Sequence, residues 1–66
     1  MSETFGKRLR RIRKEKGISQ MELSFISGLP QCQLSGYEKD CHCPSIIVLE
    51  WLCEALKVSA SELLGF

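Results

Sequence analysis

Apolar residues recur along this chain at the spacing of short helices, with polar and turn-forming residues between the repeats. Phe5, Leu9 and Ile12 stand at i, i+4 and i+7, which predicts a helix over about residues 4 to 16. Gly17 is expected to end it, because glycine readily adopts the left-handed conformation that closes helices. The other positions of this segment are mostly basic, so its apolar stripe is expected to face a core.

Two short helices are predicted next, close together in the chain. The sequence "SQME" at residues 19 to 22 is a capping box, which starts a helix whose inward residues are expected to be Leu23 and Ile26. Gly28 ends this helix. Pro30 suits the first position of a third helix, to about residue 38, because its φ is fixed and it lacks an amide proton. Two short helices joined by a tight turn that contains glycine form a helix-turn-helix.

The second half of the chain predicts two more helices after a loop. "KDCHCPS" is expected to be that loop, with Asp40 in the left-handed conformation and Pro44 preventing a helix before Ser45. Ser45 then caps a helix to about residue 57, and "SASE" at 59 to 62 is a second capping box that opens a fifth helix. The residues of the fourth helix expected to face inward are Ile46, Leu49, Leu52, Cys53 and Leu56. The predicted fold class is therefore all-α, a single domain of five helices over residues 1–66.

Charge is distributed unevenly along the chain, although the net charge is only +1. Residues 1 to 16 carry seven bases and two acids, a net of +5, whereas the remaining residues carry two bases and six acids, a net of −4. A strongly basic segment is typical of a protein that binds a polyanion. A solvated helix face explains the same charges, so charge by itself leaves both interpretations open.

The apolar runs are too short for a membrane span, and the basic N-terminus leads into no apolar segment like that of a signal peptide. We therefore expect a cytoplasmic protein, in which thiols stay reduced. The cysteines are Cys32, Cys41, Cys43 and Cys53. The sequence Cys41-His42-Cys43 raises the alternatives of a metal site or a redox sensor. A structural tetrahedral site normally needs four ligands, so we predict inert loop thiols, no metal and no cofactor.

The predicted third helix has few apolar residues. Leu34 and Tyr37, three positions apart, are the pair that needs to face a core. The side chains expected to point variously outward are Gln31, Cys32, Gln33, Ser35 and Gly36. A glutamine amide both donates and accepts hydrogen bonds, so it can bond bidentately to adenine in the major groove of DNA. Exposed polar residues without a ligand show the same pattern, and the helix alone gives no preference between these interpretations.

A longer sequence pattern favours the hypothesis that the chain binds DNA. From about residue 5 to 64 the chain reads "FGKRLRRIRKEKGISQMELSFISGLP...LSGYEKD...PS...L..L..AL.VS.SELL", which resembles the lambda-repressor and Cro-like helix-turn-helix family of phage and bacterial regulators. The most specific parts are "RxxRKEKGISQ", the Gly28 turn, Glu38, "PS" before the fourth helix and "ALKVSASELL". The resemblance implies a lambda-repressor-like bundle of five helices that binds double-stranded DNA. Its third helix would enter the major groove and its second would lie across the backbone.

The resemblance also implies roles for individual residues. The residues that match DNA-contacting positions of the family are Gln20, Gln31, Cys32, Gln33, Ser35, Gly36 and Lys39. Gln20 matches a glutamine that donates to a phosphate and can brace the third helix. The three residues from Gln31 match positions that touch base edges, Ser35 and Gly36 match positions near the groove floor or a phosphate, and Lys39 matches a backbone contact. Arg13 and Glu38 match a partly buried salt bridge.

Large apolar residues also fall outside the predicted inward positions. Met21 and Phe25 are i, i+4 on the second helix, and Ile47 and Trp51 are i, i+4 on the fourth. An exposed apolar patch usually marks a partner surface. We expect a homodimer formed by the fourth helix with help from the fifth, on a palindromic operator with half-sites one helical turn apart. The alternative is that the C-terminal tail folds back over this patch. The residues of the predicted dimer interface are Ile47, Val48, Trp51 and Phe66.

The function predicted from these observations is a sequence-specific DNA-binding transcriptional regulator. An enzyme is not expected, because His42 is the only histidine and has no obvious nucleophile with an orienting partner. One alternative is a protein-interaction module, such as an antitoxin or the partner of a larger regulator, with weakened DNA recognition. Another is a metal-responsive regulator that uses the cysteines.

Overall fold

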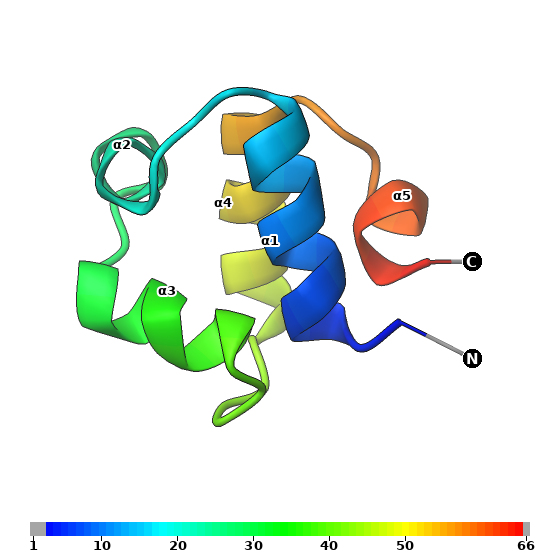
Figure 1. Ribbon diagram of the computed structural model, residues 1–66. Helices are drawn as coiled ribbons and strands as arrows, with labels where there is room; N and C mark the ends of the chain where they lie inside the picture. The colour runs from blue at the N-terminus through cyan, green and yellow to red at the C-terminus, as the bar shows by residue number, and fades with distance from the viewer. Residues whose placement is uncertain (1–2, 66) are drawn as a thin grey trace.

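The computed structural model describes residues 3–65, which form five helices and no strand. α1 spans Phe5–Glu15, α2 Gln20–Ser27, α3 Gln31–Glu38, α4 Ile46–Leu56 and α5 Ala60–Leu64. α2 and α3 lie on one side of the molecule and α5 on the other (Figure 1), and α1 contacts both α3 and α5. The predicted all-α fold class is confirmed. No helix within residues 3–65 has the length and apolar character needed to cross a bilayer.

Most of the helices begin at a hydroxyl side chain that accepts a hydrogen bond from an amide three residues later. These N-cap residues are Thr4, Ser19, Ser45 and Ser59. Ser19 forms the complete predicted capping box, whereas at Ser59 the structure records only the bond from the Glu62 amide. Pro30 was predicted at the first position of α3 but is its N-cap, because its ψ of 143° is extended and lies outside the helical region.

Residues in the left-handed conformation end α1 and α3. Gly17 follows α1 with φ 71°, as expected for a glycine at this position. Asp40 follows α3 with φ 60°, which confirms the left-handed conformation predicted for it. The amides of Asp40 and Cys41 donate to the carbonyls of Tyr37 and Gly36 at 3.1 and 2.8 Å. This closing pair of hydrogen bonds fixes the direction in which the chain leaves α3.

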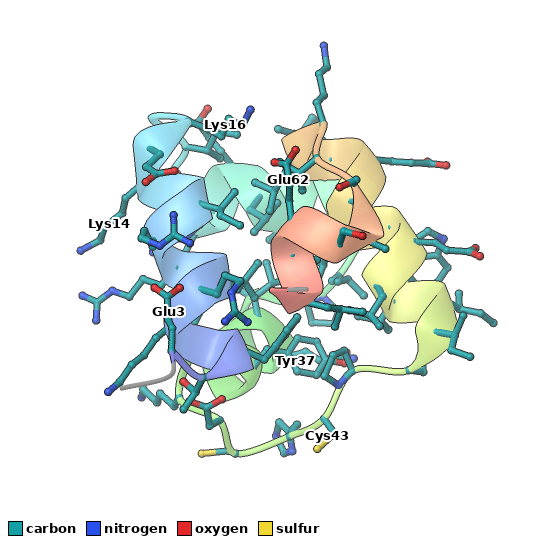
Figure 2. All side chains as sticks on the ribbon, turned by 90° about the vertical axis from the view of Figure 1, so that its right-hand side faces the viewer. Glu3, Lys14, Lys16, Tyr37, Cys43 and Glu62 are labelled. Atoms are coloured by element: carbon teal, nitrogen blue, oxygen red, sulfur yellow. The ribbon has the colours of Figure 1, made fainter. Side chains whose placement is uncertain are left out.

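The core is built from leucines contributed by every helix. The buried apolar residues are Leu9, Ile12, Leu23, Leu29, Leu34, Tyr37, Val48, Leu52, Leu56 and Leu63. Each fully buried leucine contributes about 2 kcal/mol through removal of apolar surface from water. In Figure 2 Tyr37 points into the interior, whereas Lys14 and Lys16 project from α1 into solvent. The core therefore orients α3 through its inner residues and leaves its outer face uncovered.

Two predictions about inward faces are wrong. The buried residues of α4 are Val48, Leu52 and Leu56, whereas Ile46 is 76% exposed. The spacing of apolar residues does not identify the buried face of α4, because nearly all positions of this helix are apolar. Packing against α2 and α5 decides which face is buried. On α2, Ile26 is 52% exposed instead of buried, because α2 places a single residue, Leu23, in the core.

Candidate nucleic-acid interface

The site begins at the N-terminus of α2, where the capping box fixes the first turn. Ser19 Oγ accepts from the amide of Glu22 at 3.0 Å, and the Glu22 carboxylate accepts from the amide of Ser19 at 3.4 Å. Both amides are thereby satisfied without water. Gln20, the first residue of α2, has a half-buried side chain. Its position on a rigid turn is what allows it to meet α3.

The connection from α2 to α3 is short and anchored in the core. Gly28 ends α2 with φ 79°, a conformation that glycine adopts without strain. Leu29 is 4% exposed, and Ser24 Oγ donates to its carbonyl. Pro30 then precedes α3. The connection therefore has few ways to move, and α3 leaves α2 in one direction.

α3 has an inner and an outer face, but only part of the predicted outer set is exposed. Leu34 is fully buried and Tyr37 is 4% exposed, whereas Gln31 and Cys32 are exposed at the start of the helix. Gln33 is half-buried, and its Nε2 donates to the Tyr37 hydroxyl at 2.5 Å. The first turn of α3 thus presents amide and thiol groups to solvent, while Leu34 and Tyr37 anchor the helix in the core.

Gln20 and Gln31 are brought together by the turn. Gln31 Nε2 donates to Gln20 Oε1 at 3.4 Å, although the two residues are eleven apart in sequence. This contact orients both side chains and leaves the Gln20 amide nitrogen and the Gln31 carbonyl oxygen free to bond a ligand. This contact lies where the family resemblance implies that Gln20 braces the third helix.

Gly36 does not lie on the outer face, contrary to the prediction. It is buried, and a Cβ at this position would lie 2.8 Å from Nε2 of His42 and closer still to the ring carbon Cδ2. The His42 ring also packs edge-on against Tyr37, with ring centroids 6.3 Å apart. The loop after α3 folds back over Gly36, so this residue allows close packing of the loop instead of contact with DNA.

A hollow lies between the start of α2, the end of α3 and α1. The residues that line it are Arg10, Arg13, Ser19, Gln20, Ser35, Glu38 and Lys39. Arg10 and Lys39 are exposed, and Ser35 is half-buried. Three bases against one acid give the hollow a positive charge, which suits a phosphate. Arg10 was not among the predicted DNA-contacting residues, although its i, i+3 spacing from Arg13 places both on one face of α1.

Arg13 and Glu38 form the predicted ion pair beneath this hollow. Arg13 Nε donates to Glu38 Oε2 at 2.7 Å and Nη2 donates to Oε1 at 3.2 Å, with the two side chains only 10% and 6% exposed. Arg13 Nη1 also donates to the carbonyl of Ile18 at 2.9 Å. The pair joins α1 to the last residue of α3 and to the loop before α2. It therefore fixes the positions of all three elements around the hollow.

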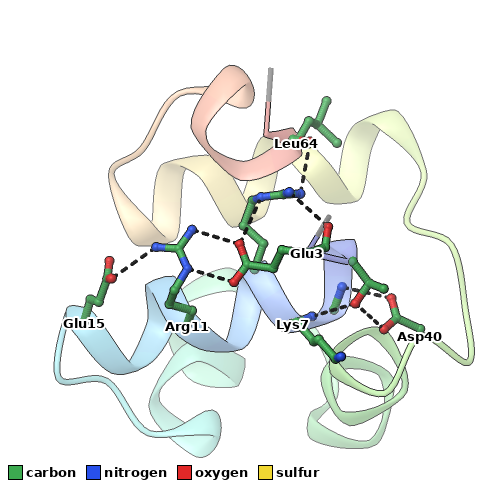
Figure 3. A network of polar contacts seen from close by, with 9 residues as sticks. Glu3, Lys7, Arg11, Glu15, Asp40 and Leu64 are labelled. Atoms are coloured by element: carbon green, nitrogen blue, oxygen red, sulfur yellow. Dashed lines mark hydrogen bonds and ion pairs between the residues drawn. The ribbon is translucent and has the colours of Figure 1, made fainter. Parts of the chain in front are cut away.

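A second contact joins α3 to the N-terminus of α1. The Asp40 carboxylate accepts from Thr4 Oγ1 at 2.7 Å and from the Gly6 amide at 2.9 Å. These bonds lower the pKa of Asp40, the Thr4 hydroxyl having the larger effect, with help from the charge of Lys7. Figure 3 shows Asp40 and Lys7 together at this end of α1. The end of α3 is thus fixed to α1 on two sides.

A further network joins the described ends of the chain across α1. Arg8 Nη2 donates to the Glu3 carbonyl at 3.0 Å and Nη1 donates to the Leu64 carbonyl at 3.1 Å (Figure 3). Arg11 donates to the Glu3 carboxylate and to Glu15, and the first bond lowers the pKa of Glu3. These groups lie on the side of α1 away from α3 and stabilise the fold without contributing to the site.

Large apolar side chains are exposed on α2 and α4. The exposed large apolar residues are Met21, Phe25, Ile26, Ile46, Ile47 and Trp51. Phe25 is the most exposed at 89%. Val48, predicted to belong to a dimer interface, is 7% exposed and packs in the core, so it is unavailable to a partner. Phe66 lies outside the described residues.

The cysteines stay apart from one another. All four are free thiols, of which Cys53 is half-buried and the others are exposed. Burial raises the pKa of Cys53, with a smaller contribution from the charge of Glu50. Within residues 3–65 no three side chains of His, Cys, Asp or Glu gather closely enough to hold a metal ion.

Two short helices joined by a tight glycine turn, with the second helix presenting polar side chains beside a basic hollow, define a helix-turn-helix domain. Residues 9–63 match the helix-turn-helix family, and the chain belongs to it.

Named relatives agree with this family. An uncharacterised HTH-type transcriptional regulator, y4dJ of Sinorhizobium fredii, is 40% identical over 63 residues, which are 96% of this chain and 82% of that protein. The immunity repressor of Bacillus phage phi105 is 34% identical over 62 residues, and there the chain spans only 43% of the longer protein. The crystal structure of SinR, a master regulator for biofilm formation, in complex with DNA superimposes with a TM-score of 0.86 at 39% identity. It covers 91% of this chain and 97% of the SinR chain.

The family is one of DNA-binding transcriptional regulators rather than enzymes. The predicted resemblance, fold class and regulatory DNA-binding function are therefore confirmed.

Proposed function

We propose that this chain binds a palindromic operator as a homodimer, with α3 of each copy in the major groove. The observation that carries the proposal is the geometry of α3. Leu34 and Tyr37 hold one face in the core, while Gln31 and Cys32 are exposed on the other beside Gln20. A glutamine oriented in this way can bond adenine bidentately at its major-groove edge.

Phosphates of the DNA backbone would bind in the basic hollow. Gln20 presents an amide donor at the N-terminus of α2, where the helix dipole favours an anion. Arg10 and Lys39 add positive charge from α1 and from the end of α3, and Ser35 adds a hydroxyl. Contacts of this kind supply affinity without sequence preference, whereas the start of α3 supplies the preference. A regulator of this type meets its DNA in the cytoplasm, which is where we place the chain.

The dimer would form through the exposed apolar stripe of α4. Ile47 is 58% exposed and Trp51 is 45% exposed, one turn apart on the same helix. A two-fold axis through this stripe would bring identical residues of the two copies together. Recognition helices about 34 Å apart would match half-sites separated by one turn of DNA.

Selection of bound sequences from a random duplex pool tests the proposal. We expect an inverted repeat to be enriched. Replacing Gln31→Ala should relax preference at one base pair of each half-site, at a cost of about 1–3 kcal/mol on the preferred sequence. Replacing Lys39→Ala should weaken binding to all sequences and reduce the salt dependence by about one unit.

A matched control is Lys57→Ala. This variant removes the same charge from the end of α4, outside the hollow, and should leave DNA binding unchanged. A wild-type chain that binds no duplex at low salt would exclude the proposal. If wild type and Gln31→Ala showed the same sequence preference, α3 would not be the helix that recognises the bases.

A second candidate function is favoured by α2. Met21 and Phe25 are 67% and 89% exposed and line a shallow apolar hollow with Ile26. SinR, a relative in structure, has been crystallised with the SinI protein. If a protein partner binds this surface, Phe25→Ser should lose the protein that co-purifies with wild type from its host. Its affinity for DNA should be unchanged.

A further inference from the structure

An acid occupies an unexpected place at the end of α3. Asp40 comes directly after Lys39, which in the proposed function contacts the DNA backbone. A carboxylate near phosphates repels them, so simple electrostatics opposes an acid at this position. The position also requires a left-handed backbone with φ 60°, which favours glycine over aspartate. Both costs indicate that the carboxylate has a role of its own.

The contacts of Asp40 lie on α1. Its Oδ1 accepts from the Gly6 amide at 2.9 Å, and its Oδ2 accepts from Thr4 Oγ1 at 2.7 Å. Gly6 stands in the first turn of α1, where an amide has no carbonyl partner within its own helix. Thr4 in turn accepts from the amide of Lys7 at 3.2 Å. Asp40 therefore completes the N-terminal cap of α1 from the far end of α3, thirty-four residues away from Gly6.

α3 and α1 approach each other most closely beside this cap. A Cβ on Gly6 would lie 2.6 Å from the carbonyl oxygen of Glu38 and closer still to that of Tyr37. The Glu38 side chain bonds Arg13 on the same helix. The last turn of α3 is thus fixed at two side chains with a backbone contact between them. Its first turn has the weaker contact of Gln31 with Gln20 at 3.4 Å.

We infer that Asp40 is a positioning residue for DNA recognition, whose carboxylate sets the orientation of α3 against α1 by bonding Thr4 and Gly6. The inference rests on the proposed function, in which α3 enters the groove. Asp40 acts through the orientation of α3 and does not touch DNA. Discrimination between sequences therefore depends on it, while general attraction to DNA does not.

Two substitutions at this position separate the carboxylate from the backbone. Asp40→Gly keeps the left-handed conformation, which glycine adopts freely, and removes both hydrogen bonds. Asp40→Asn removes the charge but keeps both bonds, since its Oδ1 accepts from Gly6 and its amide donates to Thr4 Oγ1. Glu62→Gln on α5, on the side of the molecule away from α3, is the control for loss of one negative charge (Figure 1).

The measurement compares binding of the full chain to two duplexes, the sequence selected by wild type from the random pool and a scrambled sequence. We expect Asp40→Gly to bind the selected duplex about tenfold more weakly, the size of a typical coupling between sites. Its binding to the scrambled duplex should be unchanged or tighter, because an acid has been removed. Asp40→Asn and Glu62→Gln should keep the wild-type ratio. Amide exchange of Gly6 should quicken in Asp40→Gly and stay slow in Asp40→Asn.

Other outcomes overturn the inference. Equal tightening on both duplexes in both Asp40 variants would mean that only the charge matters. Equal weakening on both duplexes, or an Asp40→Gly chain unfolded at the assay temperature, would make Asp40 a stability residue alone. If wild type itself does not distinguish the duplexes, the proposed function fails, and the inference fails with it. If wild type distinguishes them and Asp40→Gly does so equally well, only the inference fails.

Discussion

The guanidinium of Arg13 donates to both carboxylate oxygens of Glu38, at 2.7 and 3.2 Å, in a setting where the two side chains are about nine-tenths buried. A parallel pair of bonds of this kind is directional, because both donors lie in the plane of the guanidinium. It fixes the rotation of α3 about its own axis as well as its distance from α1. The outward direction of Gln31 therefore depends on a contact two turns away from it.

Replacing one partner of this ion pair should lower the stability of the fold. Glu38→Gln leaves the Arg13 charge buried without a counter-ion, and we expect a loss of about 3 kcal/mol in the free energy of unfolding. Urea denaturation followed by circular dichroism measures it. Arg11→Gln, which breaks exposed pairs on the outer side of α1, should lower the free energy of unfolding much less, because solvent screens exposed pairs. Similar losses in the two variants would show that burial does not strengthen the Arg13 pair.

Gly36 should respond to substitution according to the residue at position 42. Alanine within a helix is favoured over glycine by about 1 kcal/mol. In the wild type a methyl group at Gly36 meets the His42 ring, so Gly36→Ala should give no gain or a loss. In a His42→Ala background the gain of about 1 kcal/mol should appear. Thermal unfolding of the four chains is the measurement, and an equal effect of Gly36→Ala in both backgrounds would contradict the contact.

Acid should weaken the contact between α3 and the start of α1. The folded-state pKa of Asp40 is lowered, first by the Thr4 hydroxyl, so its contribution to stability is present above the usual pKa near 4 and is lost as pH falls through the folded value. Asp40→Asn cannot titrate, and its stability should fall less steeply as the pH is lowered below about 4. Urea unfolding across this range tests the difference. Parallel pH profiles would show that the carboxylate bonds are already absent in solution.

The four thiols should react at unequal rates. Cys53 is half-buried and its pKa is raised, so at neutral pH it has less thiolate than an exposed cysteine. With iodoacetamide we expect Cys32, Cys41 and Cys43 to be alkylated first and Cys53 last, as read by mass spectrometry of peptides. In urea the four rates should converge. Early alkylation of Cys53 under native conditions would mean that α4 and α5 open readily.

The dimer proposal predicts a change of mass. A glutamate placed in the apolar stripe of α4 carries charge into an interface, so Trp51→Glu should shift the chain from dimer to monomer in sedimentation equilibrium. Phe25→Ser alters the apolar surface of α2 instead and should leave the dimer intact. Retention of the dimer in Trp51→Glu, or its loss in Phe25→Ser alone, would move the interface away from α4.

Local chemistry in the sequence was sufficient to predict the helices but not every face of them. Ser19, Gly28 and Asp40 act through their own backbone neighbourhood, so their roles at helix ends could be predicted from residue type. α4 carries apolar residues around most of its circumference, and the burial of Val48 instead of Ile46 is decided by its neighbours in space.

Some residues of the candidate site could be predicted from the sequence, whereas others could not. Gln20 and Gln31 were predicted from the resemblance to the lambda-repressor and Cro-like family. The burial of Gly36 depends on how the loop places His42, a contact that no local pattern encodes. The bonds from Asp40 to Thr4 and Gly6 span more than thirty residues, so only the folded chain reveals them.

Arg8 donates to the carbonyl of Glu3 and to that of Leu64, so these two residues near the described ends of the chain lie close together on the α5 side of α1 (Figure 1). Fluorophores, affinity tags or additional domains attached there would extend away from a bound duplex. A short peptide could also join the two ends, and new termini could be opened elsewhere. Such a rearranged chain should still recognise its DNA.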